Sequence, residues 1–512
     1  MKLIVRLLLI INIFYSFNSC DILEENPKDF VSPQQFFTTE DEVLSSLYGV
    51  YEFMHNEYIG DYMKIFIGDL GVDEMLCRSV LRLDACINYT MESPSTEYSD
   101  IWRVHYKAIG AANMMISRTL NSNLDDNFKN KVVSEAKVLR SFFYYGLILF
   151  WGDVPMWFDE LDIDRVANLP RTRRTEIVKQ LNIDLDDATK YLPDSYDSKN
   201  IGRITVWAAK ALQARINILE SNWQKSYDLA NDIITNSSHK LLDNYNDIFD
   251  PKNKLNEEII FFTSSLTDVK GSMLPSFTSP RTIDESVMLT NFFNKGLTTV
   301  RPDGVTVNKA NQICQGWGMF SSSKGLLDSY EDGDRRKDIM DWNGLLMSDG
   351  TFVQFAGGNG GGSGHYTLKW ADFDCKSNNS SRDICHIRLG EVYIIKAESA
   401  NELGKVKDAI DALNELRERA FGDDSHNYPD NLDKGAIKKA IVNENKWELA
   451  GEGVRRWYLC HWGYDYLYDA VQTLKDENPK AATNIKSHHV LFKIPVEEFV
   501  KNPSLGDNNP GY

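Results

Sequence analysis

The chain of 512 residues carries 74 acidic and 56 basic side chains, a formal charge of −18 at pH 7. This excess of negative charge repels phosphate backbones and anionic lipid headgroups, so nucleic acid is an unfavourable partner. Only seven cysteines occur in the whole length, too few for a disulfide framework to hold a chain of this size.

The first predicted element is a secretory signal. A basic start precedes an apolar run from Leu7 to Phe14, which is shorter than the ~20 apolar residues that span a bilayer and fits a signal peptide over residues 1–19. Ser19 is the small residue that cleavage requires, and Cys20 follows it. Cys20 is therefore either an ordinary cysteine of the mature chain or the lipid-acceptor cysteine of a bacterial lipoprotein, and we favour lipidation.

Helical patterns dominate residues 20–266. In Ser134–Phe150 the apolar side chains recur at helical spacing on one face. Gly152 follows this run, with a proline shortly after it, which is a usual helix stop. Farther on, residues 207–237 read as two helices that are broken near Ser221.

A second helical region covers residues 386–512. From Leu389 onward two apolar stripes follow one another, and Gly404 stands between them. Alanines on both stripes allow a close approach, which favours an αα-hairpin similar to tetratricopeptide units. No regular 34-residue period runs through the chain. The prediction is a mostly α fold in which dispersed helix-turn-helix pairs form a scaffold.

Residues 267–385 differ in character from both helical regions. Gly, Ser, Pro and aromatic residues dominate there, which indicates loops and short strands. A loop region of this length inside a compact domain is usually functional. We therefore expect a helical scaffold with an irregular insertion, and we expect the insertion to be the ligand surface.

Sequence motifs for catalysis or metal binding are missing. The glycine run Gly357–Gly364 lacks the Lys-Ser/Thr pair of a phosphate-binding loop. No H-E-x-x-H and no paired C-x-x-C occurs, so a zinc site is not indicated. Carboxylates for a glycosidase pair are abundant, but the sequence singles out none. We predict a protein that is not an enzyme and has no cofactor, metal or catalytic residue.

Six separated stretches carry a family resemblance, and they occur in the family's order across nearly all of the mature chain. They are 36–51, 101–116, 135–156, 245–261, 387–404 with 412–420, and 491–512. The third contains E-x-x-x-L-R-x-x-x-Y-x-x-L followed by Gly-Asp-Val-Pro, and the last ends in N-P-S-L-G-D-N-N-P-G-Y. Together they resemble the SusD/RagB family of nutrient-binding outer-membrane lipoproteins.

One stretch departs from the family pattern. Within residues 444–463, Asn445 stands where the family usually has Arg, Tyr458 where it has Asp, and His461 where it has Arg. These differences question one local arrangement of ion pairs and leave the expected fold unchanged.

The resemblance implies a location, a partner and a ligand class. It implies that Cys20 is lipidated and that the protein sits on the outer face of a Gram-negative outer membrane. It also implies a SusC-like TonB-dependent transporter as partner. The ligand that it implies is most often an oligosaccharide and in some branches a peptide.

Residue chemistry suggests where such a ligand would lie. The C–H faces of sugar rings stack on aromatic side chains, and their hydroxyls need polar groups. The predicted ligand-binding residues are four aromatics of the insertion and three charged residues in the loop after the first helix: Trp317, Trp342, Tyr366, Trp370, Asp73, Glu74 and Arg78. Trp102, Trp151 and Trp207 lie in helical patterns, where core packing is the better interpretation.

The sequence thus favours a cell-surface protein that captures oligosaccharide and delivers it to a transporter. Three other functions stay open: a peptide-binding member of the same family, a surface glycoside hydrolase, and a tetratricopeptide-type scaffold that binds protein segments only. An aromatic-rich insertion suits both glycan and peptide, so the sequence does not choose between these two ligands.

Overall fold

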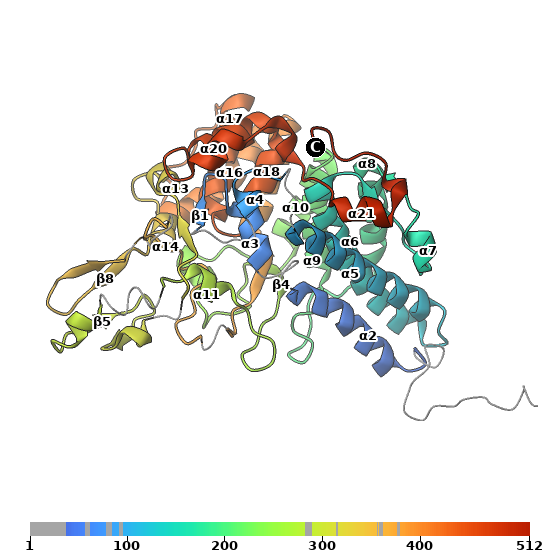
Figure 1. Ribbon diagram of the computed structural model, residues 1–512, viewed down its shortest axis with the longest axis horizontal. Helices are drawn as coiled ribbons and strands as arrows, with labels where there is room; N and C mark the ends of the chain where they lie inside the picture. Colours follow the sequence, from blue (N-terminus) through green and yellow to red (C-terminus); the bar gives the residue numbers. More distant parts are fainter. Residues whose placement is uncertain are drawn as a thin grey trace, which may run out of the picture.

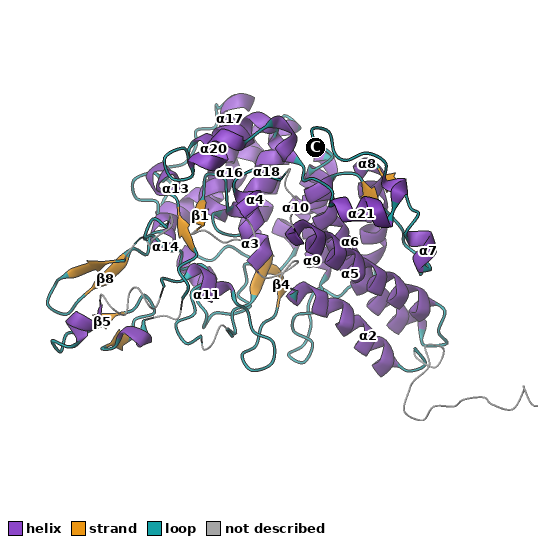
Figure 2. Ribbon diagram, viewed as in Figure 1, coloured by secondary structure: helices purple, strands orange, loops and turns teal. Residues whose placement is uncertain are grey.

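The computed structural model describes residues 37–56, 62–77, 84–91, 96–281, 289–313, 316–355, 357, 362–375 and 379–512. About 52% of it is helical and its strands are few and short (Figure 2), so the predicted mostly α fold is confirmed. Within the described ranges no helix combines the length and apolarity that crossing a membrane requires. The predicted signal peptide and Cys20 lie outside the described residues.

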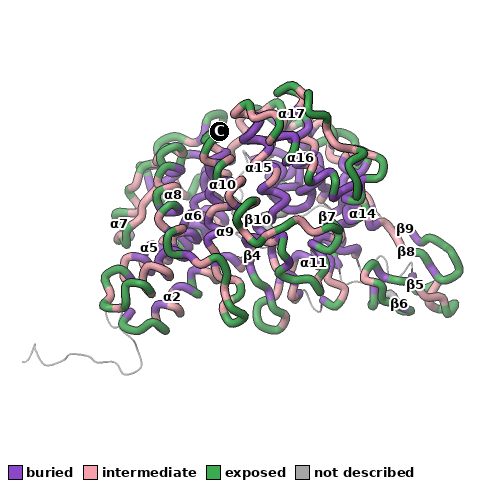
Figure 3. Tube along the Cα trace, turned by 180° about the vertical axis from the view of Figure 1, so that it is seen from behind, coloured by how far each residue is buried: buried purple, intermediate pink, exposed green. Residues whose placement is uncertain are grey.

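The N-terminal helices pack on one another in chain order. They are α2 (Glu40–Glu52), α5 (Thr96–Leu120), α6 (Asp126–Trp151), α8 (Arg174–Ala188), α9 (Val206–Ile218) and α10 (Trp223–Asn236). In Figure 3 the buried residues are purple, and long purple stretches run along α6 and α9 in the middle of this stack. The arrangement gives one continuous apolar core from α2 to α10.

Local signals set the ends of these helices. The Thr39 side chain accepts from the backbone N–H of Glu42, whose own carboxylate accepts from Thr39, and this capping box starts α2. Asp125 caps the start of α6 in a similar way. The predicted end at Gly152 and the predicted break at Ser221 are both confirmed, and both residues have positive φ angles, +70° and +55°.

The C-terminal helices continue the stack. The αα-hairpin of α15 (Leu389–Glu402) and α16 (Val406–Phe421) turns at Gly404, as predicted, and α15 packs against α10. The remaining helices are α17 (Lys434–Leu449), α18 (Arg455–Trp462), α19 (Tyr464–Gln472), α20 (Pro479–Asn484) and α21 (Val496–Lys501). The red C-terminal segment in Figure 1 returns to the teal helices, where Asn502 Nδ2 donates to Leu169 O at 2.8 Å.

Two paired strands close the base of the insertion. Strand β4 (Ile259–Thr263) runs antiparallel to β10 (Ile384–Arg388), with Thr263 opposite Ile384. Between them lie short elements: α11 (Leu274–Thr278), β5 (Thr299–Val300), β6 (Thr306–Val307), β7 (Phe320–Ser322), α13 (Lys324–Ser329), α14 (Arg336–Met340), β8 (Gly344–Leu346) and β9 (Phe352–Gln354). The β8–β9 hairpin projects at one end of the molecule (Figure 1). The division into three regions at 267 and 386 stays a prediction.

An early segment crosses to the other half of the molecule. Helix α3 (Tyr62–Asp69) packs against α18, and β1 (Met75–Cys77) pairs antiparallel with β7, with Met75 opposite Ser322. Residues of the N-terminal region therefore lie beneath the insertion and beside the C-terminal helices.

A buried network of charges ties these regions together. Arg388, at the end of β10, donates to Glu258 Oε1 at 2.8 Å, to Glu448 Oε1 at 2.5 Å and to Glu452 Oε2 at 2.9 Å. Arg419 of α16 donates to the same Glu258 at 2.9 Å. All five side chains are buried, so the network joins β4, β10, α16 and α17 in a low-dielectric environment where such bonds are strong.

Candidate functional site

Trp317 is the exposed tryptophan of the chain. All eleven tryptophans lie within the described ranges, and Trp317 is the most exposed of them, with 38% of its surface accessible. It lies in the insertion, between α11 and β7. An exposed indole is a natural platform for the apolar face of a ligand.

Aromatic side chains from three elements support Trp317. The Phe277 ring of α11 meets it edge to face, with ring centroids 4.8 Å apart. Phe277 in turn contacts Phe66 of α3 at 5.2 Å, and Phe66 contacts Phe320 of β7 at 4.1 Å. The crossing N-terminal segment and the insertion thus meet directly beneath the exposed indole, which fixes its position.

Backbone hydrogen bonds fix the same segment. The N–H of Trp317 donates to Ser276 O at 2.6 Å, that of Gly318 to Ser279 O at 2.9 Å, and that of Met319 to Phe277 O at 3.0 Å. The chain carrying the indole is therefore anchored along the C-terminal part of α11 instead of forming a free loop.

The glycines that flank Trp317 allow this close approach. A Cβ atom at Gly316 would lie 2.3 Å from the carbonyl oxygens of Ser279 and Pro280. Gly318 has φ +59°, and a Cβ there would lie 2.9 Å from the backbone N of Arg281. The Gly-Trp-Gly sequence is the local signal for an aromatic presented on tightly packed backbone.

The other three aromatics predicted for the platform lie in the core. Trp342 and Tyr366 exchange two backbone hydrogen bonds of 2.9 Å and pack around Phe355. Trp370 is 2% exposed, and its indole N–H donates to Gly451 O at 2.7 Å. The expectation of a four-residue exposed platform is corrected, because Trp342 and Tyr366 belong to a small core formed by the short strands of the insertion and Trp370 belongs to the main core.

The predicted acidic residues are buried as well. Arg455, on α18, donates from two of its nitrogens to the two carboxylate oxygens of Asp73, at 2.9 and 2.8 Å. Glu74 accepts from the N–H of Gly451 at 3.3 Å, and burial raises the pKa of its carboxyl well above the ordinary value. These hydrogen bonds of Asp73 and Glu74 hold the crossing segment to the C-terminal helices, and both side chains are covered from solvent. Arg78 lies outside the described residues.

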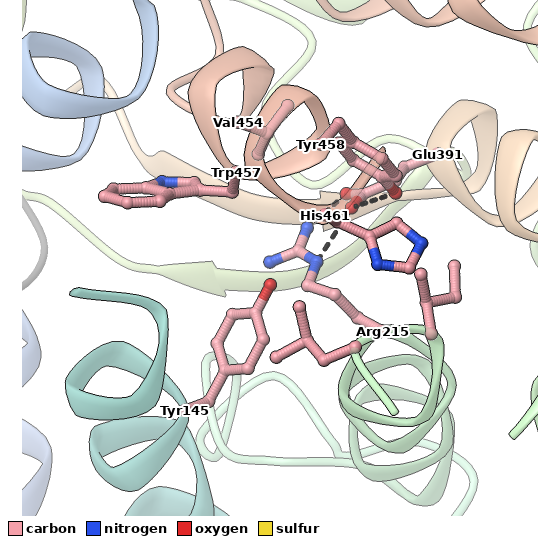
Figure 4. A pocket seen from close by; sticks show the side chains of 9 residues that line it. Tyr145, Arg215, Glu391, Val454, Trp457, Tyr458 and His461 are labelled. Atoms are coloured by element: carbon pink, nitrogen blue, oxygen red, sulfur yellow. Dashed lines mark hydrogen bonds and ion pairs between the residues drawn. The ribbon is translucent and has the colours of Figure 1, made fainter. Parts of the chain in front are cut away.

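Figure 4 shows a cavity among α6, α9, α15 and α18 that contains two of the departures from the family pattern. Arg215 Nε donates to Glu391 Oε1 at 2.7 Å, and the Tyr458 hydroxyl donates to the same oxygen at 3.1 Å. His461 Nε2 lies 3.5 Å from Glu398 Oε1. The third departure, Asn445, accepts from Arg455 Nη1 at 2.9 Å.

The Figure 4 cavity has a structural role. Its volume is about 20 Å³, which is room for about one water. The Arg215–Glu391 pair joins helices α9 and α15 in the interior, and Tyr458 completes the hydrogen bonds of the carboxylate. At the three positions that depart from the family pattern, other polar side chains therefore make the contacts, and the helices remain connected.

A His–Asp pair lies in the insertion, and no hydroxyl of the described residues is hydrogen-bonded to its imidazole. His365 Nδ1 contacts Asp341 Oδ1, an arrangement that orients the imidazole in serine hydrolases. The nearby Ser363 hydroxyl, however, donates to Ser322 O at 2.7 Å and accepts from the His365 backbone N–H. Among the described residues no group of three or more His, Cys, Asp or Glu side chains is placed to hold a metal ion.

Family models match the two ends of the chain, and a relative matches nearly its whole length. Residues 341–512 match the model of the "SusD family", and residues 21–218 match a model described as "Starch-binding associating with outer membrane". A SusD-like protein of Formosa agariphila is 28% identical over 98% of this chain and 98% of its own length.

Solved structures share the fold at lower identity. A SusD homologue from Bacteroides thetaiotaomicron has a TM-score of 0.77 and 19% identity, covering 94% of this chain and 98% of that one. A structure named as a laminarin-binding SusD-like protein has a TM-score of 0.72 and 20% identity, covering 93% of this chain and 100% of that one.

Proposed function

Because the chain belongs to the SusD/RagB family, we propose that it is a cell-surface protein that captures oligosaccharide and delivers it to a SusC-like TonB-dependent transporter. The observation that carries the ligand part of this proposal is Trp317, an exposed indole held by an aromatic cluster from three elements. The names of a family model and of a structural neighbour, which refer to starch and to laminarin, support carbohydrate as the ligand class.

The chemistry of the Trp317 surface suits a sugar. A pyranose ring places its C–H groups on an aromatic face, and the hydroxyl groups around the ring remain hydrated or bind neighbouring polar groups. Because Phe277 and the backbone bonds already fix the indole, little side-chain entropy is lost on binding. Binding without bond cleavage is proposed.

Trp317→Ala is expected to lower the affinity for glycan by about 30-fold, since truncation of a central aromatic contact costs about 2 kcal/mol. The measurement is mobility of the protein, without residues 1–20, in native gels cast with a panel of polysaccharides. Wild type should be retarded by at least one polymer, and Trp317→Ala should migrate nearly as in the empty gel.

Phe352→Ala is the matched control for this experiment. Phe352 is an exposed aromatic of the same insertion, on β9, and is 55% accessible; its loss should leave retardation unchanged. Retardation that survives Trp317→Ala would move the site elsewhere. No retardation by any polymer would favour the peptide-binding alternative, and release of reducing ends from the retarding polymer would indicate a hydrolase.

We propose that Cys20 carries the membrane anchor after removal of residues 1–19. The several acyl chains of a lipoprotein bind a bilayer firmly, whereas one chain binds only marginally. Cys20→Ala should therefore shift the protein from the membrane fraction to the soluble fraction of disrupted cells, as measured by immunoblotting of both. Equal membrane content of Cys20→Ala and wild type would contradict lipid attachment at this residue.

A further inference from the structure

An aromatic cleft, separate from the Trp317 surface, lies between α5, β2 (Val154–Pro155), α7 (Ile163–Val166) and the C-terminal segment. Its volume is about 340 Å³, within the range of small-molecule sites. Figure 1 shows α7 and α21 on the opposite side of the molecule from β8, and the cleft shares no lining residue with the Trp317 surface. Its apolar lining consists of Trp102, Tyr106, Pro155, Trp157, Val166 and Leu505, with Ala167 at the rim.

The aromatic wall of this cleft is held rigidly. The Trp157 ring stacks on Tyr106 with centroids 5.2 Å apart and planes 12° from parallel. The Tyr106 hydroxyl donates to Pro155 O at 2.9 Å. Tyr144 binds the backbone of Trp157 at both its N–H and its carbonyl, each at 3.0 Å. Trp157 is half-buried and lines the cleft, so the wall is preformed for a flat apolar face.

The lining of this cleft includes three cationic side chains. Arg103 and Lys107 lie one turn apart on α5, and Lys501 lies on α21. Glu498 is the carboxylate of the lining, and it binds Lys501 at 2.6 Å. Lys107 makes no hydrogen bond or ion pair with any residue that the structure describes. Arg103 is paired with Asp100 and Lys501 with Glu498, so Lys107 is the cation of this lining that is left to attract an anion, in a chain of net charge −18.

From this combination we infer that the cleft binds an acidic sugar residue, whose ring stacks on Trp157 and whose carboxylate binds Lys107. The inference rests on the proposed glycan-binding function and adds a second subsite with its own charge preference. Arg103 and Lys107 lie in the same family-like stretch, 101–116, as Trp102 and Tyr106, and Lys501 lies in the stretch 491–512.

The test is a ligand-observed NMR titration of the protein, without residues 1–20, with glucuronate and galacturonate and with their neutral counterparts glucose and galactose. The uronates should bind at least fivefold more tightly than the neutral sugars, and added salt should reduce the difference. Lys107→Gln should remove the preference. Lys179→Gln, the same charge change at an exposed position of α8, should leave it intact.

Two further variants separate the cleft from the rest of the molecule. Ala167→Trp fills the cleft without removing any core side chain, so it should abolish the preference for uronates over neutral sugars. Trp317→Ala should leave this preference unchanged. Benzoate serves as a second carboxylate, and binding of benzoate without binding of either uronate would overturn the assignment to a sugar.

Equal affinities for charged and neutral sugars, or a preference for uronates that survives Ala167→Trp, would also overturn the inference. Neither result would affect retardation of the protein by a polysaccharide through Trp317. Absence of retardation by every polymer would instead refute the proposed function, so failure of the cleft and failure of the glycan-binding function give different results.

Discussion

Arg388→Met is expected to lower the free energy of unfolding by about 3–5 kcal/mol, because it removes the cation that three buried carboxylates share and leaves their negative charges only partly compensated. Arg388 donates to Glu258, Glu448 and Glu452, and all three carboxylates are buried. Methionine fills much of the same volume, so the loss comes mainly from the missing charge. The measurement is equilibrium unfolding in urea, followed by circular dichroism.

Arg118→Met is the matched control for this variant. Arg118 binds Glu160 at 2.7 Å, but the two side chains are 30% and 38% exposed, and pairs of this kind contribute at most about 1 kcal/mol. If Arg388→Met cost no more than Arg118→Met, the buried network would contribute nothing to stability. A soluble but unfolded Arg388→Met protein would agree with the prediction at its upper limit.

The Arg388 network also shows where sequence reasoning ends. Periodicity and capping signals predicted the end of α6 at Gly152 and the α15–α16 hairpin at Gly404, because neighbours along the chain determine them. Arg388 lies within a family-like stretch, but its partners come from residues 258, 448 and 452. No local pattern indicates that these four charges meet.

At the candidate site, too, some features could be predicted from neighbours along the chain and others could not. Trp317 could be predicted from its position in an aromatic and glycine-rich insertion, and the flanking glycines were a usable signal for a presented side chain. The burial of Trp342 and Asp73 could not be predicted, since it depends on strand pairs and on a crossing segment. The pairing of Met75 with Ser322 joins residues far apart in the sequence, and such register is set by the assembled core.

The composition of residues 267–385 led the prediction to the insertion. The cleft between α5 and α21 was not predicted, for a related reason. Trp102 was correctly predicted as a packing residue of a helix, and it is buried. The open space beside it forms only when residues 155–167 and the C-terminal segment come together. A site made from three distant segments is not visible in any one of them.

Stability is expected to be greatest near about pH 5 and to fall steeply in acid. Burial acts to raise the pKa of Glu452, but Arg388 and Lys369 outweigh it and lower the pKa to about 2. The pKa of Glu398 is also about 2, because His461 and Lys438 outweigh its burial. Both values lie below the ordinary 4.5, so folding favours the ionised form of these carboxyls.

The sign of the acid effect follows from these pKa values. Each carboxylate contributes its stabilisation fully above pH 4.5, and the contribution is lost as the pH falls toward 2, by about 3 kcal/mol for each group. Asp69 acts in the opposite sense. Burial raises its pKa from 3.8 to about 7, so its protonated form is favoured in the folded state and stability decreases as the pH rises from 4 to 7.

The measurement that checks this is the midpoint of thermal unfolding between pH 3 and pH 8 for wild type and for two variants. Asp69→Asn should flatten the decline between pH 4 and 7, because the amide does not ionise. Glu452→Gln should be less stable than wild type at pH 7 and should lose less stability between pH 5 and pH 3. A wild-type midpoint that is constant from pH 3 to pH 8 would mean that these buried carboxyls titrate alike in the folded and unfolded chains.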